Sequence, residues 1–247
     1  MSIPPSHRWR WFYSVVAGLC KAFFSLTFFK IMLPSKSMNL PPVPSLKEAA
    51  RRDDQEGFRL IRSFLAVEIP GTILKKIDQV QRDLKSTGAD VRWTSPEKIH
   101  LTLKFFGNIE ESGIESIVKS LEGPAKGTSR FSLKVRGVGA FPHIKSPRVI
   151  WMGLVDEREA LAPFQKQLEK ELEKIGYVPE ERRFHPHLTL GRMQSGKGKE
   201  GLIGRMEKYK EEEFGEFQVE SIVLFKSDLK PAGPIYTSLR ELNLGGI

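Results

Sequence analysis

One tetrapeptide, His-Leu-Thr-Leu, occurs twice in this chain of 247 residues, at positions 100–103 and 187–190. Successive side chains of a β-strand point to opposite faces, so the histidine and threonine of each copy share one face and the two leucines share the other. Each copy therefore predicts a strand with an apolar back and a front that carries an imidazole and a hydroxyl. Two such fronts in one cleft would hold two proton-transfer groups and two hydroxyl donors.

The surroundings of the two copies repeat as well, because both follow the order strand, helix, motif strand, helix, strand. The expected flanking elements are 59–69, 72–84, 114–121 and 131–136 for the first copy, and 149–152, 161–175, 202–210 and 217–225 for the second, with a last strand at 235–242. A tetrapeptide that recurred by chance would not be flanked by the same order of secondary-structure elements at both places.

This repetition predicts a main domain over residues 58–247 with two internal repeats, at about 58–141 and 147–247. We expect an α+β fold with two pseudo-symmetric lobes, whose mainly antiparallel sheets are flanked by helices. Approximate two-fold symmetry would place the two motif strands side by side, facing a central cleft between the lobes. Ligand pockets favour such interfaces.

Residues 1–57 fall outside the repeat and indicate an N-terminal extension that ends in a linker. Residues 11–33 are apolar and aromatic, but Lys21 and Lys30 leave no uncharged run of the roughly 18 to 20 residues that cross a bilayer. A signal anchor, an interfacial anchor and an extension read from a misplaced start codon all stay open. We favour the extension over membrane association, because nothing in the main domain needs this segment.

Charge and cysteine content restrict the partners and the compartment. Of the formal charge of +9, the first 57 residues contribute +4 and the remainder +5, so the main domain is only mildly basic. That charge permits a phosphate or nucleic-acid ligand without requiring one. The single cysteine, Cys20, excludes an intramolecular disulfide and a cysteine-based zinc cluster, and it fits a reducing compartment.

The two motifs contain the groups that hydrolysis of a cyclic phosphodiester needs. One histidine can take a proton from water and the other can protonate the leaving oxygen, while Thr102 and Thr189 hydrogen-bond to the non-bridging oxygens. With ordinary pKa values near 6.5, one ring can be neutral and the other protonated at neutral pH. We therefore expect no metal and no other cofactor. The residues alone do not decide which of His100 and His187 is the acid.

His185 offers an alternative interpretation of the second copy, because His185 and His187 share strand parity and could form a metal-binding pair. Pro186 disturbs the strand, however, and no cysteine or carboxylate lies beside the pair. We therefore favour the phosphate chemistry.

Further site residues are expected close to the motifs. Arg192 could clamp a phosphate, although strict alternation puts it on the leucine face, so it reaches the cleft only if the strand ends or bulges near Gly191. Lys104 and Phe106 share the histidine face of the first motif. We expect Lys104 to meet a nucleic-acid backbone, and Phe106 to stack on a base or, more commonly for such an aromatic residue, to fill the core.

Basic side chains in loops near the expected cleft form a last group of candidates. Together they could guide a polyanion, although any one of them can be ordinary solvated charge. They are Lys145, Arg148, Arg182, Arg183, Lys197 and Lys199. Among them we expect Arg148 to bind the ligand.

In this ordered set of motifs the chain resembles the two-histidine (2H) phosphoesterases, and within them the RNA 2',3'-cyclic phosphodiesterases, also called 2'-5' RNA ligases. The resemblance runs from about Arg59 to Leu244 and is specific as an ordered set. It rests on Arg62-Ser63-Phe64-Leu65-Ala66-Val67, Val91-Arg92-Trp93, His100 to Gly107, Phe141-Pro142, Pro147 to Trp151, and Pro186 to Arg192.

The resemblance implies a bilobal fold and metal-independent hydrolysis of RNA 2',3'-cyclic phosphate ends to 2'-phosphomonoesters. It makes His100 the proton donor and His187 the proton acceptor, with Thr102 and Thr189 binding phosphate. It leaves a 2'-5' RNA ligase activity open and implies a cytoplasmic location, which residues 1–57 put in question. We expect a monomer with RNA as its partner.

Two alternatives stay open at this stage. One is an RNA-end-binding protein whose hydrolysis is incidental. The other is a 2H phosphodiesterase that acts on a small cyclic nucleotide. The sequence does not separate them, because the walls of the expected cleft are loops of variable composition.

Overall fold

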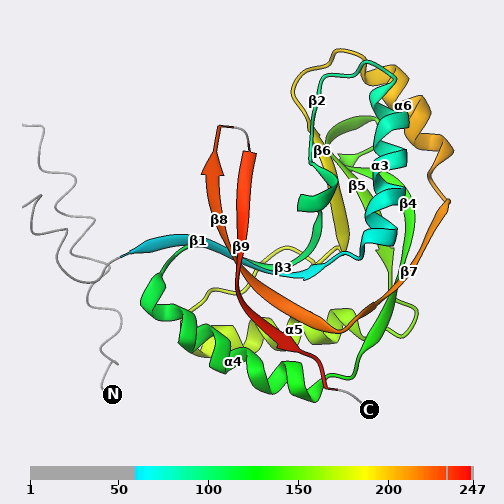
Figure 1. Cartoon of the computed structure of the whole chain (residues 1–247). Coiled ribbons are helices and arrows are strands. Elements are labelled where there is room, and N and C mark those ends of the chain that lie inside the picture. Colours follow the sequence, from blue (N-terminus) through cyan, green and yellow to red (C-terminus); the bar gives the residue numbers. More distant parts are fainter. Residues whose placement is uncertain (1–58, 232, 246–247) are drawn as a thin grey trace, which may run out of the picture. The chain divides into compact units, whose positions relative to one another are not determined.

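The computed structural model describes residues 59–231 and 233–245 (Figure 1). The predicted extension, and with it the question of an anchor at residues 11–33, lies outside this range. The described elements are β1 (Leu60–Glu68), α3 (Gly71–Lys85), β2 (Val91–Trp93), η2 (Pro96–Lys98), β3 (His100–Glu110), η3 (Glu111–Gly113), α4 (Ile114–Gly127), β4 (Phe131–His143), β5 (Ser146–Val155), α5 (Leu161–Lys174), β6 (His187–Met193), α6 (Lys199–Lys208), β7 (Glu213–Val219), β8 (Ser221–Lys230) and β9 (Gly233–Asn243).

These strands form one sheet with the order β7-β4-β5-β6-β3-β1-β8-β9, and β2 pairs with β6 beside this path. All pairs between these strands are antiparallel. The predicted α+β class, with a large antiparallel sheet flanked by helices, is confirmed. The sheet is continuous, however, where a separate sheet was expected for each lobe.

The motif strands β3 and β6 meet at the centre of this sheet through a narrow junction. They share a single register pair, Leu101 with Leu188. Farther along β6, residues 191–193 pair with β2 instead. Two half-sheets, β7-β4-β5-β6 and β3-β1-β8-β9, therefore meet where the two copies of the motif lie side by side.

The two repeats exchange their outer strands across this junction. β4 follows the first motif, but it pairs with β5 and β7, because the chain turns from His143 to Ser146 and a short hairpin forces its two strands to be neighbours. The strand expected at 217–225 is in fact two strands, which part at Glu220. The first, β7, completes one half-sheet, and the second, β8, crosses to pair with β1 in the other.

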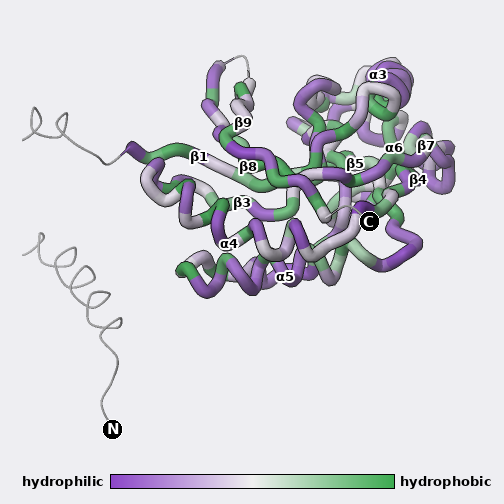
Figure 2. The backbone as a smooth tube through the Cα atoms, turned by 60° about the horizontal axis from the view of Figure 1, so that its bottom comes forward, coloured by the Kyte–Doolittle hydropathy of each residue, from purple (hydrophilic) through white to green (hydrophobic). Residues whose placement is uncertain are grey.

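The helices cover the sheet in pairs, α4 beside α5 and α3 beside α6 (Figure 1). Apolar and polar residues alternate along α4 and α5 (Figure 2), and their apolar sides are buried. The four motif leucines lie in one hydrophobic core together with apolar residues of α3, α4, α5 and α6. Burial of the leucines fixes the orientation of both motif strands, so the histidine faces point away from the core.

Candidate active site

Both motif strands contain a β-bulge at the same position of the repeat. The register with the neighbouring strand shifts by one residue at Leu103 in β3 and at Leu190 in β6. A bulge interrupts the alternation of side chains. Two residues beyond each bulged leucine, Phe105 and Arg192 are exposed, while the residue between is buried. Phe105 and Arg192 thus occupy equivalent positions beside the histidine face.

The register pair Leu101–Leu188 also sets how the motif side chains face one another. Extending the antiparallel register by one residue places His100 opposite Thr189, and Thr102 opposite His187. The two histidines then lie on a diagonal, where such positions are about 7 to 8 Å apart. In this register each histidine has a threonine directly opposite it on the neighbouring strand.

The two histidines have the same hydrogen-bonding arrangement. Nδ1 of His100 lies 2.9 Å from the carbonyl oxygen of Lys98, and Nδ1 of His187 lies 2.7 Å from that of His185. A carbonyl oxygen only accepts, so Nδ1 carries the proton in both rings. In each neutral ring Nε2 is therefore an acceptor, and in each protonated ring Nε2 is a donor. Either histidine can act as base or as acid through Nε2.

Aromatic side chains hold both imidazoles. The His100 ring stacks on Phe64, with ring centroids 4.6 Å apart, and meets the ring of Tyr236 edge to face at 5.3 Å. The His187 ring meets Phe141 edge to face at 5.0 Å. These contacts restrict ring rotation and remove water from one side of each ring, which disfavours the charged form.

Burial lowers the pKa of both histidines below the ordinary value of 6.5, and the hydrogen bond to a backbone carbonyl opposes this in each. At His187 the positive charges of Arg192 and His185 lower the pKa further. The neutral form is therefore favoured at both rings, and only at His187 do neighbouring cations add to the effect of burial.

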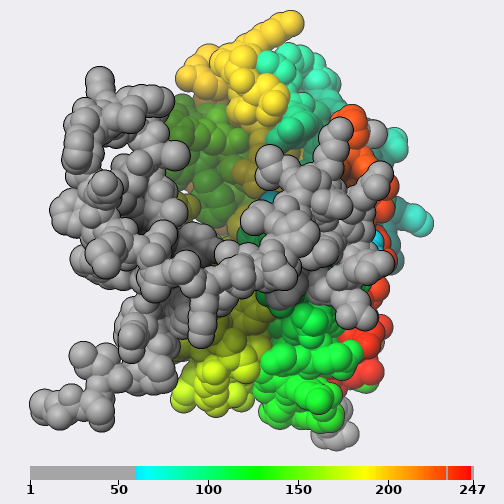
Figure 3. Space-filling model, turned by 90° about the vertical axis from the view of Figure 1, so that its left-hand side faces the viewer, coloured from blue at the N-terminus to red at the C-terminus, as the bar shows by residue number. Residues whose placement is uncertain are grey.

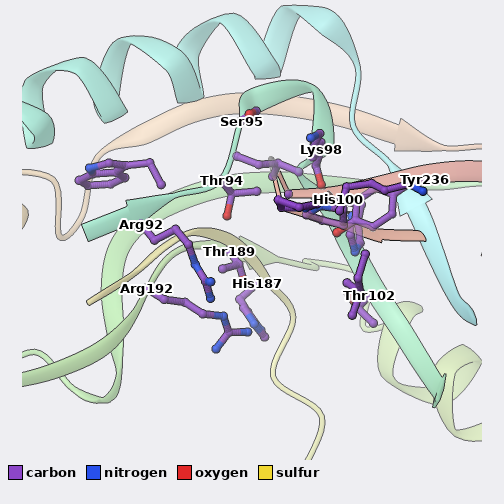
Figure 4. A pocket seen from close by; sticks show the side chains of 17 residues that line it. Arg92, Thr94, Ser95, Lys98, His100, Thr102, His187, Thr189, Arg192 and Tyr236 are labelled. Carbon is purple, nitrogen blue, oxygen red and sulfur yellow. Dashed lines mark hydrogen bonds between the residues drawn. The ribbon is translucent and has the colours of Figure 1, made fainter. Parts of the chain in front are cut away.

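One cavity of about 580 Å³, shown in Figure 4, is lined by the histidine and threonine side chains of both motifs: His100, Thr102, His187 and Thr189. Four cations line it with them, and no aspartate or glutamate does among the described residues. These cations are Arg92, Lys98, Arg192 and Lys230. A cavity with this lining attracts anions.

Two of these cations are cross-strand partners. Arg92 of β2 pairs in register with Arg192 of β6, and both side chains reach the cavity beside His187 (Figure 4). Like charges that face each other across a strand pair repel, unless an anion lies between them. The Arg92–Arg192 pair is therefore suited to bind a phosphate between its two guanidinium groups. Arg192 was expected to reach the cleft only if the strand ended or bulged near Gly191. The bulge at Leu190 meets this condition.

The structure contradicts the expected position of Lys104. The bulge at Leu103 turns its side chain into the protein, where the ammonium lies 2.6 Å from the Glu169 carboxylate and donates to the Val178 carbonyl at 2.6 Å. Only 8% of Lys104 is exposed. The expected contact with a nucleic-acid backbone is therefore replaced by a buried ion pair.

A second register shift, at Phe106, separates the two roles expected for that residue. The Phe106 ring packs edge to face on Tyr177, with centroids 5.1 Å apart, and lies against the hydrophobic core. Core filling, the commoner of its two expected roles, is therefore what the structure supports. Its neighbour Phe105 is 47% exposed, and the guanidinium of Arg62 lies 4.5 Å from the centre of its ring.

Arg148, the last predicted residue, does not line the histidine cavity. It lines a second cavity of about 1000 Å³, which has Thr102, His187 and Arg192 in common with the first. The sequence reasoning gave no role to Arg92, Lys98, Lys230 and Tyr236, which line the first cavity. Arg92 belongs to the segment Val91-Arg92-Trp93 of the family resemblance. A strand of three residues has too little periodicity to predict which face of the sheet the Arg92 side chain lies on.

Within residues 59–231 and 233–245, no group of three or more His, Cys, Asp or Glu side chains is arranged to hold a metal ion. None of the helices in the same part of the chain is long and apolar enough to cross a membrane.

A family model described as LigT like Phosphoesterase matches residues 67–151 and 153–236, and each match contains one copy of the motif. Two relatives are named RNA 2',3'-cyclic phosphodiesterase. That of Methanothermobacter thermautotrophicus is 35% identical over 184 residues, which cover 74% of this chain and 99% of the relative. That of Aquifex aeolicus is 34% identical over 191 residues, which cover 76% of this chain and 100% of the relative.

Solved structures share the fold. The crystal structure of TT0787 of Thermus thermophilus is 26% identical, has a TM-score of 0.64 and covers 75% of this chain and 99% of its own. The crystal structure of E. coli LigT with 3'-AMP is 21% identical, has a TM-score of 0.60 and has the same coverage.

Proposed function

This chain belongs to the LigT-like phosphoesterase family, the group that its paired motifs resemble, and we propose that it hydrolyses the 2',3'-cyclic phosphate ends of RNA to 2'-phosphomonoesters. The relatives from Methanothermobacter and Aquifex are named RNA 2',3'-cyclic phosphodiesterase, which supports this substrate class. One observation carries the proposal: two histidines with free Nε2 atoms and two threonines line a single cavity, whose charged lining residues are all basic. The two half-sheets then act as two lobes of one split site.

Two proton transfers account for the reaction. His187 Nε2 takes a proton from a water molecule as its oxygen attacks phosphorus, and His100 Nε2 gives a proton to the 3' oxygen as the P–O3' bond breaks. The phosphate stays on the 2' oxygen. Thr102, Thr189 and the Arg92–Arg192 pair hold the non-bridging oxygens and stabilise the charge that builds up on them. The chain returns to its starting state when His187 releases its proton to solvent and His100 gains one.

The assignment of His187 as base and His100 as acid follows the resemblance of the two motifs to those of the 2H phosphoesterases. Burial favours the neutral form of both, and Arg192 and His185 add to this effect at His187 alone. The cations beside His187 are compatible with a neutral ring that serves as the base. His100 is then the acid that protonates the leaving oxygen.

The same arrangement admits an RNA 5'-hydroxyl in place of water. If His187 removes the proton of that hydroxyl, attack on the cyclic phosphate with departure of the 3' oxygen joins the two strands through a 2'-5' bond. Hydrolysis and ligation then differ only in the nucleophile. Water is far more abundant, so hydrolysis is expected to dominate.

The proposal is tested with an oligonucleotide that ends in a 2',3'-cyclic phosphate, incubated with the purified chain with and without EDTA. We expect addition of one water molecule, a product phosphate that phosphatase removes, and the same rate with chelator. His100→Ala and His187→Ala should each lower turnover by roughly 10² or more. His143→Ala is the matched control, since His143 is exposed and lines neither cavity.

Three results would count against this reaction. Near-normal turnover in either motif variant would overturn the acid–base assignment. Activity that EDTA abolishes and zinc restores would favour metal-assisted hydrolysis. Tight, salt-sensitive RNA binding without any turnover would favour an RNA-end-binding protein.

A further inference from the structure

The second cavity opens directly from the site of the proposed reaction. Its volume is about 1000 Å³, and Thr102, His187 and Arg192 line both cavities. Its other walls come from Phe105 of β3, the hairpin between β4 and β5, helix α5, and the loop that leads to His187. We call it the arginine groove, after Arg148, Arg182 and Arg183. Figure 3 views the molecule from a side on which residues near α6 (gold) and near α5 (yellow-green) lie at the surface.

The charge of the arginine groove is available to a ligand. Arg148, Arg182 and Arg183 are exposed, and none of the ion pairs in the described part of the chain involves them. Two carboxylates also line the groove. Glu169 is neutralised by its ion pair with Lys104, and Glu180 lies in the exposed loop. Positive charge is therefore in excess.

Aromatic rings lie among these arginines. Phe105, Phe141 and Phe184 line the groove, and Phe105 has nearly half of its surface exposed. Guanidinium groups beside exposed rings suit single-stranded nucleic acid, because the cations follow the phosphates while the rings stack on bases. The volume is at the top of the roughly 300 to 1,000 Å³ range of sites for small ligands. It is more than a terminal phosphate needs.

Buried contacts hold the groove wall in place. Lys104 binds Glu169 of α5 and the Val178 carbonyl, and Gln165 binds both Glu169 and the Leu103 carbonyl. These contacts join the bulged motif strand to the start of the loop that carries the groove arginines. A ligand therefore meets a preorganised wall and loses less free energy to ordering it.

We propose that the arginine groove binds the RNA nucleotides on the 5' side of the cyclic phosphate, so that the chain acts on oligonucleotide ends in preference to free nucleoside 2',3'-cyclic phosphates. This inference rests on the proposed function. The terminal nucleotide occupies the histidine cavity, and the strand leaves it past Arg192 into the groove. The predicted contact of Arg148 with RNA becomes part of this path.

The test compares kcat/KM for adenosine 2',3'-cyclic phosphate with that for a tetranucleotide ending in the same group. We expect the tetranucleotide to be favoured at least tenfold. The double variant Arg182→Ala/Arg183→Ala should lose at least tenfold with the tetranucleotide and stay within twofold with the mononucleotide. The kcat/KM of this variant with the tetranucleotide should also depend less on salt. The slope of log kcat/KM against log salt concentration should become shallower by about 0.7 for each phosphate that the variant no longer neutralises.

Lys75→Ala/Lys76→Ala is the matched control. It removes the same charge from two adjacent exposed residues of α3 that line neither cavity, and it should leave both substrates unaffected. Equal kcat/KM for the two substrates in the unmodified chain would overturn the inference. The inference would also be overturned if the arginine variant lost activity equally with both substrates. The same holds if the lysine control lost as much tetranucleotide activity as the arginine variant.

Failure of the proposed function would look different, because neither substrate would then be hydrolysed. In that case the groove is tested by fluorescence anisotropy with a labelled tetranucleotide that ends in a 2'-phosphate. Weaker binding by the arginine variant than by the lysine control would support the groove, and equal binding would reject it.

Discussion

Gln81 donates a hydrogen bond from its side-chain nitrogen to the carbonyl oxygen of Leu190, at 2.8 Å, so that a helix of the first repeat holds the bulge of the second motif strand. The same nitrogen donates to the Thr94 carbonyl at 2.8 Å. Gln165 of α5 makes the reciprocal contact to the Leu103 carbonyl at 3.3 Å. Since the motif strands share only one register pair, these two buried glutamines brace the halves of the site against each other.

Replacing Gln81 with methionine keeps the volume of the side chain but removes both hydrogen bonds. The Leu190 carbonyl keeps the Thr94 N–H as a donor, while the part-buried Thr94 carbonyl loses its side-chain donor, so we expect the free energy of unfolding to fall by about 1 kcal/mol. The bulge that aims Arg192 also loses support, so kcat should fall more than KM rises. Denaturant unfolding and steady-state kinetics measure the two effects.

The control for this variant is Gln167→Met, which makes the same change at an exposed position of α5. It should alter the free energy of unfolding by less than about 0.5 kcal/mol and leave the kinetics unchanged. If Gln81→Met loses stability but keeps its kcat, Gln81 supports the fold without positioning the site.

The pH dependence of kcat/KM should reflect the buried state of both histidines. The proposed reaction needs one protonated ring and one neutral ring, and burial lowers the pKa of each below 6.5. As pH rises, the acid loses its proton at a lower pH than an ordinary histidine would. We therefore expect a bell-shaped profile whose maximum lies below pH 6.5 and whose two limbs belong to the coupled pair. An alkaline limb centred above the ordinary histidine pKa would contradict this.

Much of this site could be predicted from the sequence, because it depends on strand alternation. Leu101 and Leu188 bury one face of each motif strand, and the histidines follow on the other face. The errors arise where alternation breaks. Bulges at Leu103 and Phe106 depend on backbone contacts with β1, which the residue pattern does not contain.

Long-range pairing is the second source of error. The repeat predicted the helices and the motif strands in their order, yet it missed β2 and did not predict that β4 and β8 would each join the opposite half-sheet. Arg92 was missed for the same reason. Its place in the cavity depends on pairing with Arg192, a residue far away in the sequence.

The Arg92–Arg192 pair should cost stability in the absence of a ligand. Like charges directly opposite on neighbouring strands repel, with cross-strand pairs contributing about 0.2 to 1 kcal/mol. Arg92→Gln should therefore raise the free energy of unfolding by an amount of this order in phosphate-free buffer. It should also weaken inhibition by inorganic phosphate, by roughly tenfold, since the variant lacks a charge-assisted hydrogen bond.

Thermal unfolding with and without phosphate separates the two effects of this variant. The unmodified chain should gain stability from added phosphate, and Arg92→Gln should gain less. Lys119→Gln, at an exposed position of α4 outside both cavities, is the control and should respond like the unmodified chain. A destabilised Arg92→Gln variant that responds fully to phosphate would show that the pair does not bind the anion.

Lys104 provides the sharpest contrast between a structural cation and an RNA-binding one. Lys104→Met leaves the buried Glu169 carboxylate without its ion pair, and loss of one partner from such a pair costs about 3 to 5 kcal/mol. Lys104→Met combined with Glu169→Leu removes both charges and should restore most of that stability. The double variant should also keep the salt dependence of oligonucleotide hydrolysis, because the Lys104 ammonium is held by Glu169 and the Val178 carbonyl. If stability is restored but the salt dependence becomes shallower, the result would support the originally predicted contact between Lys104 and RNA.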